Sequence, residues 1–145
     1  MQDDPEITWD GWMRLANTAE YLERMAAGNL AETSKHRATR RDCLARAWRS
    51  IPQDRDYVHG WSFTYAELFW SQRAELTEDD KNFFANLTLR MIQLFDQEGP
   101  AFGYRARALM LKGQREDAQA AAAKAVELAP SDPLMKELLQ QIRGS

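Results

Sequence analysis

Apolar residues recur every three or four positions along most of the chain, which is the spacing of one face of an α-helix. The glycines and prolines are few, seven and five, and they fall between these stretches. The pattern therefore predicts an all-α fold of seven helices. Because the connections are short, neighbouring helices are expected to pack antiparallel, as three helical hairpins followed by a closing helix.

The hairpins are expected in one domain spanning 1–145, at about residues 7–52, 55–98 and 99–130, with the closing helix at 132–143. The first helix should turn inward Trp12, Leu15, Ala16, Ala19, Leu22 and Ala26. The closing helix should do the same with Leu134, Met135, Leu138, Leu139 and Ile142. Expected helix starts and stops are the cap Thr33, the capping box Thr77 and Asp80, the break Gly113, and a cap at Ser131 or Asp132.

Alanine dominates residues 113–133, GQREDAQAAAAKAVELAPSDP. Ala118, Ala122, Ala125 and Ala129 fall on one helical face, and alanine itself favours the helix. A face of methyl groups lets a partner helix approach to the close end of the roughly 8–10 Å range of helix separations. We therefore expect a tight crossing between this helix and the one before it.

Residues 99–132 resemble a tetratricopeptide repeat, a helix-turn-helix unit with small residues where its helices cross and a proline at its end. With Gly99 as the first position, the agreeing residues are Phe102, Ala106, Leu109, Ala118 and Ala125, followed by Pro130. Two residues depart from the family pattern: Arg105 replaces a leucine and Ala122 replaces an aromatic. These departures indicate looser packing or a bulky neighbour.

Residues 9–98 resemble the same family only at the level of pattern. Each of the first two hairpins is about ten residues too long, which amounts to roughly one and a half extra turns per helix. The resemblance implies a right-handed superhelical stack of two elongated repeats, one standard repeat and a capping helix. Three repeats are enough for a stable stack.

The resemblance also implies that a partner peptide or protein binds in a concave groove lined by the first helix of each repeat. The groove positions are then Asp10, Met13, Asn17, Glu20, Tyr21, His59, Phe63, Glu67, Arg107 and Met110. Such a mixed groove suits an amphipathic helix or an extended segment, and its acidic members favour a basic partner. A clamp for a C-terminal carboxylate is not supported, because only Asn17 and Arg107 suit it. A shifted register would instead place some of these residues in the core.

Five aromatic residues crowd the stretch WSFTYAELFW, residues 61–70. Trp61, Tyr65 and Phe69 fit the core face of the helix. Phe63 and Trp70 then point elsewhere, either onto a binding surface, where aromatics are enriched, or beneath a neighbouring hairpin.

The helix within residues 33–49 is basic, although the whole chain has a formal charge of -3, which gives no reason to expect a nucleic-acid binder. One hypothesis is an anion patch made of Lys35, Arg37, Arg40 and Arg41, which would bind an anionic partner or nucleic acid through this helix. The favoured interpretation is ion pairing with Glu20, Glu23 and Glu32 inside the first hairpin. A self-associating subunit, such as a homodimer, is a third hypothesis.

Signals for catalysis or metal binding are weak. The two histidines stand far apart, and the sequence has no HExxH motif, glycine-rich phosphate loop or nucleophile elbow. A lone cysteine excludes a disulfide framework and a cysteine-built zinc site. No apolar stretch is long enough for a membrane span, and MQDDPEITWD does not resemble a targeting signal. We therefore expect a cytoplasmic adaptor or chaperone-like module that has no enzymatic activity, cofactor or metal.

Overall fold

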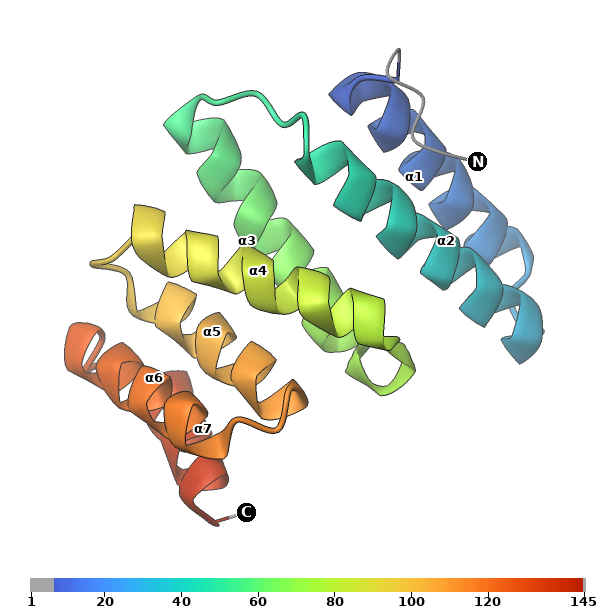
Figure 1. The fold of residues 1–145 in the computed structure, drawn as a ribbon. Helices are drawn as coiled ribbons and strands as arrows, with labels where there is room; N and C mark the ends of the chain where they lie inside the picture. The colour runs from blue at the N-terminus through green and yellow to red at the C-terminus, as the bar shows by residue number, and fades with distance from the viewer. Residues whose placement is uncertain (1–6, 145) are drawn as a thin grey trace. The chain divides into compact units, whose positions relative to one another are not determined.

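The computed structural model describes residues 7–144, and within that range it contains seven α-helices, one 3-10 helix and no strand (Figure 1). The elements are α1 (Trp9–Met25), α2 (Leu30–Trp48), α3 (Arg55–Ser71), η1 (Arg73–Glu75), α4 (Glu78–Leu94), α5 (Gly99–Leu111), α6 (Arg115–Leu128) and α7 (Pro133–Gly144). The all-α fold predicted from the sequence is confirmed. Helices α1 to α4 have 17 to 19 residues, whereas α5 and α6 have 13 and 14. Helices α1 to α4 are therefore longer than α5 and α6, as expected.

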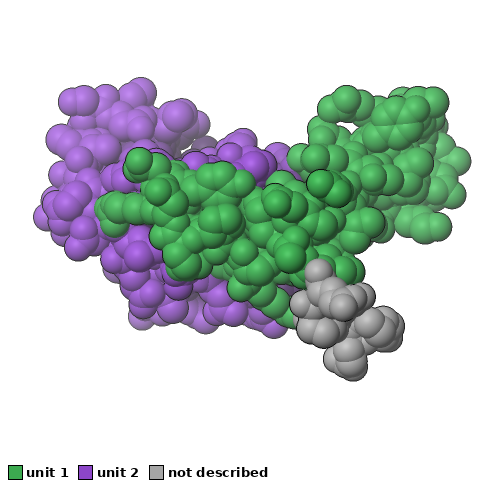
Figure 2. Space-filling view, turned by 90° about the horizontal axis from the view of Figure 1, so that it is seen from above, with its two compact units in different colours: residues 1–58 green, residues 59–145 purple. Residues whose placement is uncertain are grey.

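The chain divides into two compact units, coloured green and purple in Figure 2: Met1–Val58 and His59–Ser145. Helices α1 and α2 belong to the first unit, and α4 to α7 belong to the second. Helix α3 begins in the first unit and continues into the second. The single domain expected from the sequence stays a prediction.

In the first unit, α1 packs along α2 through small side chains. Ala16, Ala19 and Ala47 are buried, and the indole Nε1 of Trp9 donates a hydrogen bond to Tyr57 Oη at 3.0 Å. Two residues predicted to face inward, Leu15 and Leu22, are instead 46% and 41% exposed. Leu15 is offset from Ala16 by about 100° around the helix, so it lies at the edge of the buried face and not at its centre.

The cap of α2 also differs from the expectation. Asn29, not Thr33, caps the helix, because the Asn29 side chain accepts a hydrogen bond from the Glu32 backbone N–H. Thr33 lies inside the helix, where its hydroxyl donates to the carbonyl oxygen of Leu30. Further along α2, the Cys43 thiol is buried, and desolvation raises its pKa above the usual value.

In the second unit, α3 and α4 meet through aromatic rings. The ring of Phe69 lies 5.1 Å from that of Phe83 and 6.2 Å from that of Phe84, measured between centroids. Helix α4 begins with the predicted capping box: Thr77 accepts from the Asp80 N–H, and the Asp80 carboxylate accepts from the Thr77 N–H. This reciprocal pair satisfies two backbone donors that the helix itself leaves unpaired.

The alanines of α6 face α5, as expected. Ala118, Ala122 and Ala125 are completely buried, and α5 and α6 are packed together. At the start of α5, a Cβ atom built on Gly99 would lie 2.7 Å from the Ala129 Cβ and 2.9 Å from the Ala125 carbonyl oxygen. The two helices therefore cross so closely that only glycine fits at this position.

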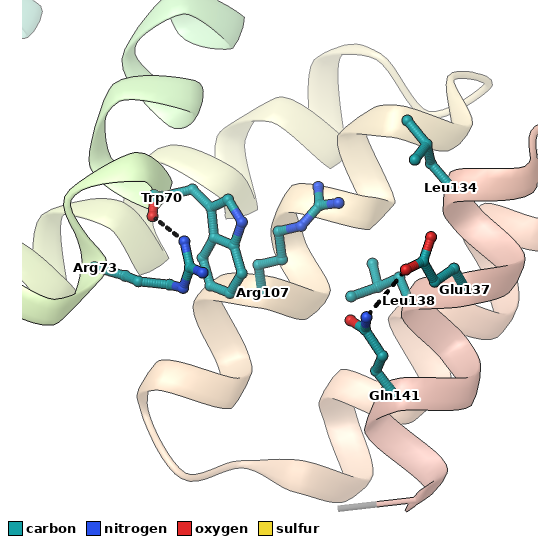
Figure 3. Close-up of a pocket in the computed structure, with 7 residues that line it drawn as sticks. All are labelled: Trp70, Arg73, Arg107, Leu134, Glu137, Leu138 and Gln141. Atoms are coloured by element: carbon teal, nitrogen blue, oxygen red, sulfur yellow. Dashed lines mark hydrogen bonds between the residues drawn. The ribbon is translucent and has the colours of Figure 1, made fainter.

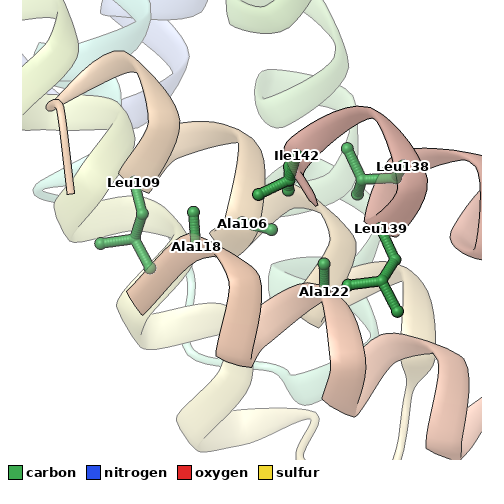
Figure 4. Close-up of a cluster of buried hydrophobic side chains, with 7 residues drawn as sticks. All are labelled: Ala106, Leu109, Ala118, Ala122, Leu138, Leu139 and Ile142. Atoms are coloured by element: carbon green, nitrogen blue, oxygen red, sulfur yellow. The ribbon is translucent and has the colours of Figure 1, made fainter. Parts of the chain in front are cut away.

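Helix α7 closes the second unit against α5 and α6. Leu138, Leu139 and Ile142 form one buried cluster with Ala106, Leu109, Ala118 and Ala122 (Figure 4). Leucine side chains thus occupy the space left by Ala122, which is the bulky neighbour that the sequence indicated. Leu134, expected to be buried, is 61% exposed because it lies in the first turn, at the edge of this contact.

The other departure from the family pattern, Arg105, also has a structural reason. Its guanidinium donates to the carbonyl oxygen of Ala85 at 2.7 Å and to the Thr88 hydroxyl at 3.5 Å. Burial lowers the pKa of Arg105. The arginine therefore ties α5 to α4 through a polar contact where a leucine would pack.

Candidate partner-binding site

A pocket of about 230 Å³ opens in the second unit between α7 and the ends of α3 and α5 (Figure 3). Its lining residues are Trp70, Arg73, Arg107, Leu134, Glu137, Leu138 and Gln141. A second hollow of about 240 Å³ shares Trp70, Arg107, Leu138 and Gln141 with the first and adds Met110 and Ile142. Because the two share four residues, they adjoin each other, and we call them together the α3/α5/α7 groove.

Close packing of α5 and α7 fixes one side of this groove. A Cβ atom at Gly103 would lie 2.9 Å from the sulfur of Met135, so the two helices approach closely at this point. The Asp132 side chain accepts a hydrogen bond from the Leu134 N–H at 2.9 Å, and Pro133 occupies the first helical position. Proline costs nothing there, because the first N–H of a helix has no partner within it. The contact with Gly103 and the start of the helix at Pro133 together fix the position of α7 beside α5.

Arg107 is held in the groove by aromatic rings. Its guanidinium carbon lies 5.1 Å from the ring centroid of Tyr104 and 5.6 Å from that of Trp70. Tyr104 is itself fixed, since its hydroxyl donates to a Glu67 carboxylate oxygen at 2.6 Å. Burial and this hydrogen bond raise the pKa of Tyr104 to about 12, so the phenol keeps its proton at neutral pH. The phenol therefore acts as a stable, neutral support for the arginine.

The guanidinium of Arg107 forms no hydrogen bond or ion pair with any side chain or backbone group in residues 7–144. Burial lowers its pKa, although a group with an ordinary value of 12.5 still carries a full charge at neutral pH. Arginine has five N–H donors, and contact with aromatic faces satisfies none of them by a hydrogen bond. The groove therefore contains a charged guanidinium whose N–H donors can hydrogen-bond to a ligand.

A second arginine approaches the same indole. The guanidinium carbon of Arg73 lies 4.3 Å from the ring centroid of Trp70, and its Nη1 donates to the Trp70 carbonyl oxygen at 3.0 Å (Figure 3). The side chain of Arg73 is therefore anchored at one nitrogen, while the rest of the guanidinium lies at the mouth of the pocket. Trp70 thus has two cationic groups close to it.

Helix α7 supplies the facing wall. Leu138 is buried at its base, while Leu134, Glu137 and Gln141 are exposed. The Gln141 amide donates to a Glu137 carboxylate oxygen at 3.3 Å, which partly occupies the only acidic group among the lining residues. This wall is therefore mainly apolar and neutral, with one carboxylate at its rim.

Of the groove residues expected in the second unit, Arg107 and Met110 line the α3/α5/α7 groove. Glu67 lies beside it, where it orients Tyr104. His59 and Phe63 are instead engaged within the unit. The His59 Nε2 is 2.7 Å from Glu98 Oε1, and the Phe63 ring contacts those of His59, Phe95 and Tyr104. Of the two aromatics that the sequence left open, Trp70 lines the groove, whereas Phe63 packs against other rings of the unit and stays partly exposed.

The groove residues expected in the first unit lie along α1. Asp10, Asn17 and Tyr21 are exposed, whereas Met13 and Glu20 are partly buried. Glu20 pairs with Arg24 at 2.8 Å and, across to α2, with Arg40 at 3.8 Å. Its carboxylate is therefore already occupied within the hairpin.

The basic residues of α2 face α1 in part. Arg37 pairs with Glu23 at 3.3 Å, and Arg40 with Glu20, as the favoured interpretation required. Arg41 is only 1% exposed and does not belong to a surface patch. Of the four residues of the hypothetical anion patch, only Lys35 is fully exposed. Ion pairs inside the hairpin thus engage two of these four residues, Arg37 and Arg40.

Sequence reasoning did not include Trp70, Arg73 or the α7 residues in the groove list. The sequence does carry one signal, because Trp70 is an aromatic that does not fit the core face of α3. The repeat pattern predicts α7 only as a cap and assigns no binding role to its exposed side. The α7 wall depends on the close approach of Met135 to Gly103, which no local pattern indicates.

Comparisons of the sequence with known protein families and with curated proteins find no match. Among residues 7–144, no cluster of three or more histidine, cysteine, aspartate or glutamate side chains has a geometry that could hold a metal ion. Across the same residues, every helix is too short or too polar to traverse a lipid bilayer.

Proposed function

We propose that this protein is a non-catalytic helical-repeat module, similar in arrangement to tetratricopeptide repeats, which binds a segment of a partner protein in the α3/α5/α7 groove. The observation that carries this proposal is that Trp70, Arg107 and Leu138 line the same hollow. These residues belong to α3, α5 and α7, which are every second helix along the chain. In a stack of hairpins, the first helix of each hairpin lines the same face. Helix α7 then takes the place of a first helix after α5.

The packing of α5 and α6 supports the repeat arrangement. The small residues at the crossing, Ala106, Ala118 and Ala125, are all completely buried. Arg105 and Ala122, which depart from the family pattern, each have a compensating contact in α4 or α7. The last hairpin and α7 therefore satisfy the packing that a repeat of this kind needs.

The composition of the groove supports a protein segment as the occupant. Trp70 and Met110 are side-chain types that are enriched at interfaces between proteins, as is arginine. Apolar side chains (Trp70, Met110, Leu134, Leu138 and Ile142) and polar ones (Arg73, Arg107, Glu137 and Gln141) line the groove together, so it can bind both an apolar and a polar part of a partner segment. The arginines of α2, by contrast, are mostly paired within their hairpin, so an anion-binding function for that helix is not favoured.

Site-specific photo-crosslinking tests this proposal. A photoreactive amino acid at Gln141, in the groove, is expected to capture a partner from a cell lysate. The same amino acid at the exposed Ala120 on α6 is the matched control and should not capture it. Trp70→Ala in the Gln141 protein should abolish capture of that partner. Equal capture from Ala120, or capture that persists without Trp70, would show that partners bind elsewhere.

A further inference from the structure

Two of the three charged side chains that line the pocket beside Trp70 are arginines. Arg73 and Arg107 lie against the indole, and Glu137 is the only acidic residue that lines the pocket with them. Glu67 and Asp132 lie near Arg107 but outside the lining, and each already accepts a hydrogen bond: Glu67 from the Tyr104 hydroxyl at 2.6 Å and Asp132 from the Leu134 N–H at 2.9 Å. One net positive charge therefore remains in the pocket lining, and it lies on the α3 and α5 side.

Arg107 is better placed than Arg73 to bind an anion. Its guanidinium lies over two aromatic rings and has no hydrogen-bonding partner among residues 7–144. Partial burial weakens its hydration, as the lowered pKa reflects. An arginine that is pre-positioned in this way loses little side-chain entropy when it binds a carboxylate through two parallel N–H donors.

Apolar surface lies directly beside this charge. Trp70, Met110, Leu138 and Ile142 line the part of the groove next to Arg107. A ligand that neutralises the arginine can therefore bury a neighbouring apolar side chain at the same time. Such a combination occurs in a peptide in which an acidic residue adjoins a large apolar one.

From this geometry we propose that the α3/α5/α7 groove selects a partner segment carrying an aspartate or glutamate side chain next to an apolar anchor. The carboxylate binds Arg107 through two hydrogen bonds and interacts with Arg73 at the rim, while the anchor packs on Trp70 and Leu138. This inference rests on the proposed function and adds to it the chemistry of the partner. It differs from the sequence-based expectation of a basic partner, which drew on acidic residues that lie outside this pocket.

Capped peptides provide the test. Two peptide libraries would be compared, each N-acetylated and C-amidated, with a fixed apolar residue followed by Glu in one library and by Gln in the other. Binding to the full chain is measured by fluorescence polarisation. We expect the Glu library to bind about tenfold or more tightly, as befits a charge-assisted hydrogen-bonded pair in a partly buried site. This preference should weaken as salt concentration rises.

Variants then assign the preference to one side chain. Arg107→Gln should remove the preference for Glu. Arg107→Lys should retain only part of that preference, because lysine cannot form a bidentate contact with a carboxylate. Arg90→Gln, an exposed arginine of α4, removes the same charge elsewhere and should leave the preference unchanged. Glu137→Gln should strengthen binding of the Glu library by a few fold at most, as expected for an exposed charge. Circular dichroism confirms that each variant is folded.

The outcomes separate the two proposals. Equal binding of both libraries to the groove would overturn the acidic preference and leave the proposed function standing. Binding only of uncapped peptides would overturn the side-chain assignment and point to a terminal carboxylate. If no peptide of either library binds and Gln141 captures no partner, both proposals fail. A preference for Glu that survives Arg107→Gln would show that another group recognises the acid.

Discussion

Replacing Gly99 by alanine tests the closeness of the α5–α6 crossing. The new Cβ would lie 2.7 Å from the Ala129 Cβ and 2.9 Å from the Ala125 carbonyl oxygen. Carbon atoms in favourable contact are about 3.5–4.0 Å apart, so the added methyl group is roughly 1 Å too close. The obstacle includes backbone, which cannot rotate away as a flexible side chain would. Helix α5 must therefore move relative to α6.

Two effects of opposite sign set the size of the change. Alanine favours a helix interior over glycine by roughly 0.5–1 kcal/mol, and the gain is smaller at the first residue of α5. Overpacking of a well-packed contact costs about 1–3 kcal/mol. The net expectation is that Gly99→Ala lowers the free energy of unfolding by about 1–2 kcal/mol.

Gly60→Ala is the matched control. Gly60 lies inside α3, and a Cβ atom built there would have no other heavy atom within 4 Å. With no steric cost, this substitution should raise the free energy of unfolding by roughly 0.5–1 kcal/mol. Urea unfolding followed by circular dichroism would measure both variants. In the Gly99→Ala background, Ala129→Gly should recover part of the loss, because it removes one of the two close contacts.

The reasoning is refuted if Gly99→Ala matches or exceeds the stability of the unmodified protein while Gly60→Ala behaves as expected. That result would mean that α5 and α6 are separated enough to accept a methyl group. The alanine face of α6 would then need another explanation.

Two further predictions concern other parts of the second unit. Thr77→Ala removes the capping box of α4 and should lower the free energy of unfolding by about 1 kcal/mol, measured by urea unfolding. Thr64→Ala, at an exposed position inside α3, should cost nothing or stabilise slightly, and an equal loss at both sites would contradict the capping role. In an ultraviolet pH titration, Tyr104, whose pKa is raised to about 12, should ionise at a clearly higher pH than an ordinary tyrosine. The same titration of Tyr104→Phe identifies which part of the signal belongs to Tyr104. Because the folded pKa exceeds the unfolded value of about 10, its contribution to stability is complete below about pH 10 and is lost as the pH rises towards 12. Ionisation of Tyr104 near pH 10 would mean that its contact with Glu67 is absent in solution.

Features that depend on a few neighbouring residues could be predicted from the sequence. The Thr77–Asp80 capping box was predictable because both partners lie within one turn. Gly113 was predictable as a helix break because glycine readily adopts the positive φ that commonly follows the end of a helix. In the structure its φ is 75°. The buried alanines of α6 followed from helical periodicity and the resemblance together.

Features that depend on a choice between equivalent local signals could not be predicted. Asn29 and Thr33 are both good cap residues one turn apart, and the turn between them lacks a clear apolar stripe. Leu15 was assigned to the core because it is apolar, yet α1 contacts α2 through Ala16 and Ala19, which allow a closer approach. Periodicity therefore located α1 correctly but did not identify its contact face.

The groove was predicted only where it coincides with the repeat pattern. Arg107 and Met110 were found because they occupy groove positions of a first helix. The contacts of Trp70 with Arg73 and Arg107 depend on where α3 ends and where η1 begins, which sequence spacing does not determine. The α7 wall depends on a long-range contact, and such contacts leave no periodic signal in a single sequence.

The burial of Cys43 makes it a natural reporter of motion in the first hairpin. It is the only cysteine in the chain, it is 6% exposed, and its raised pKa keeps the reactive thiolate scarce at neutral pH. Thiol reagents should therefore modify it only when the surroundings of this part of α2 transiently open, so the labelling rate measures how often that opening occurs. A cysteine introduced at an exposed position would react much faster, so a probe could be attached there without removing the native residue.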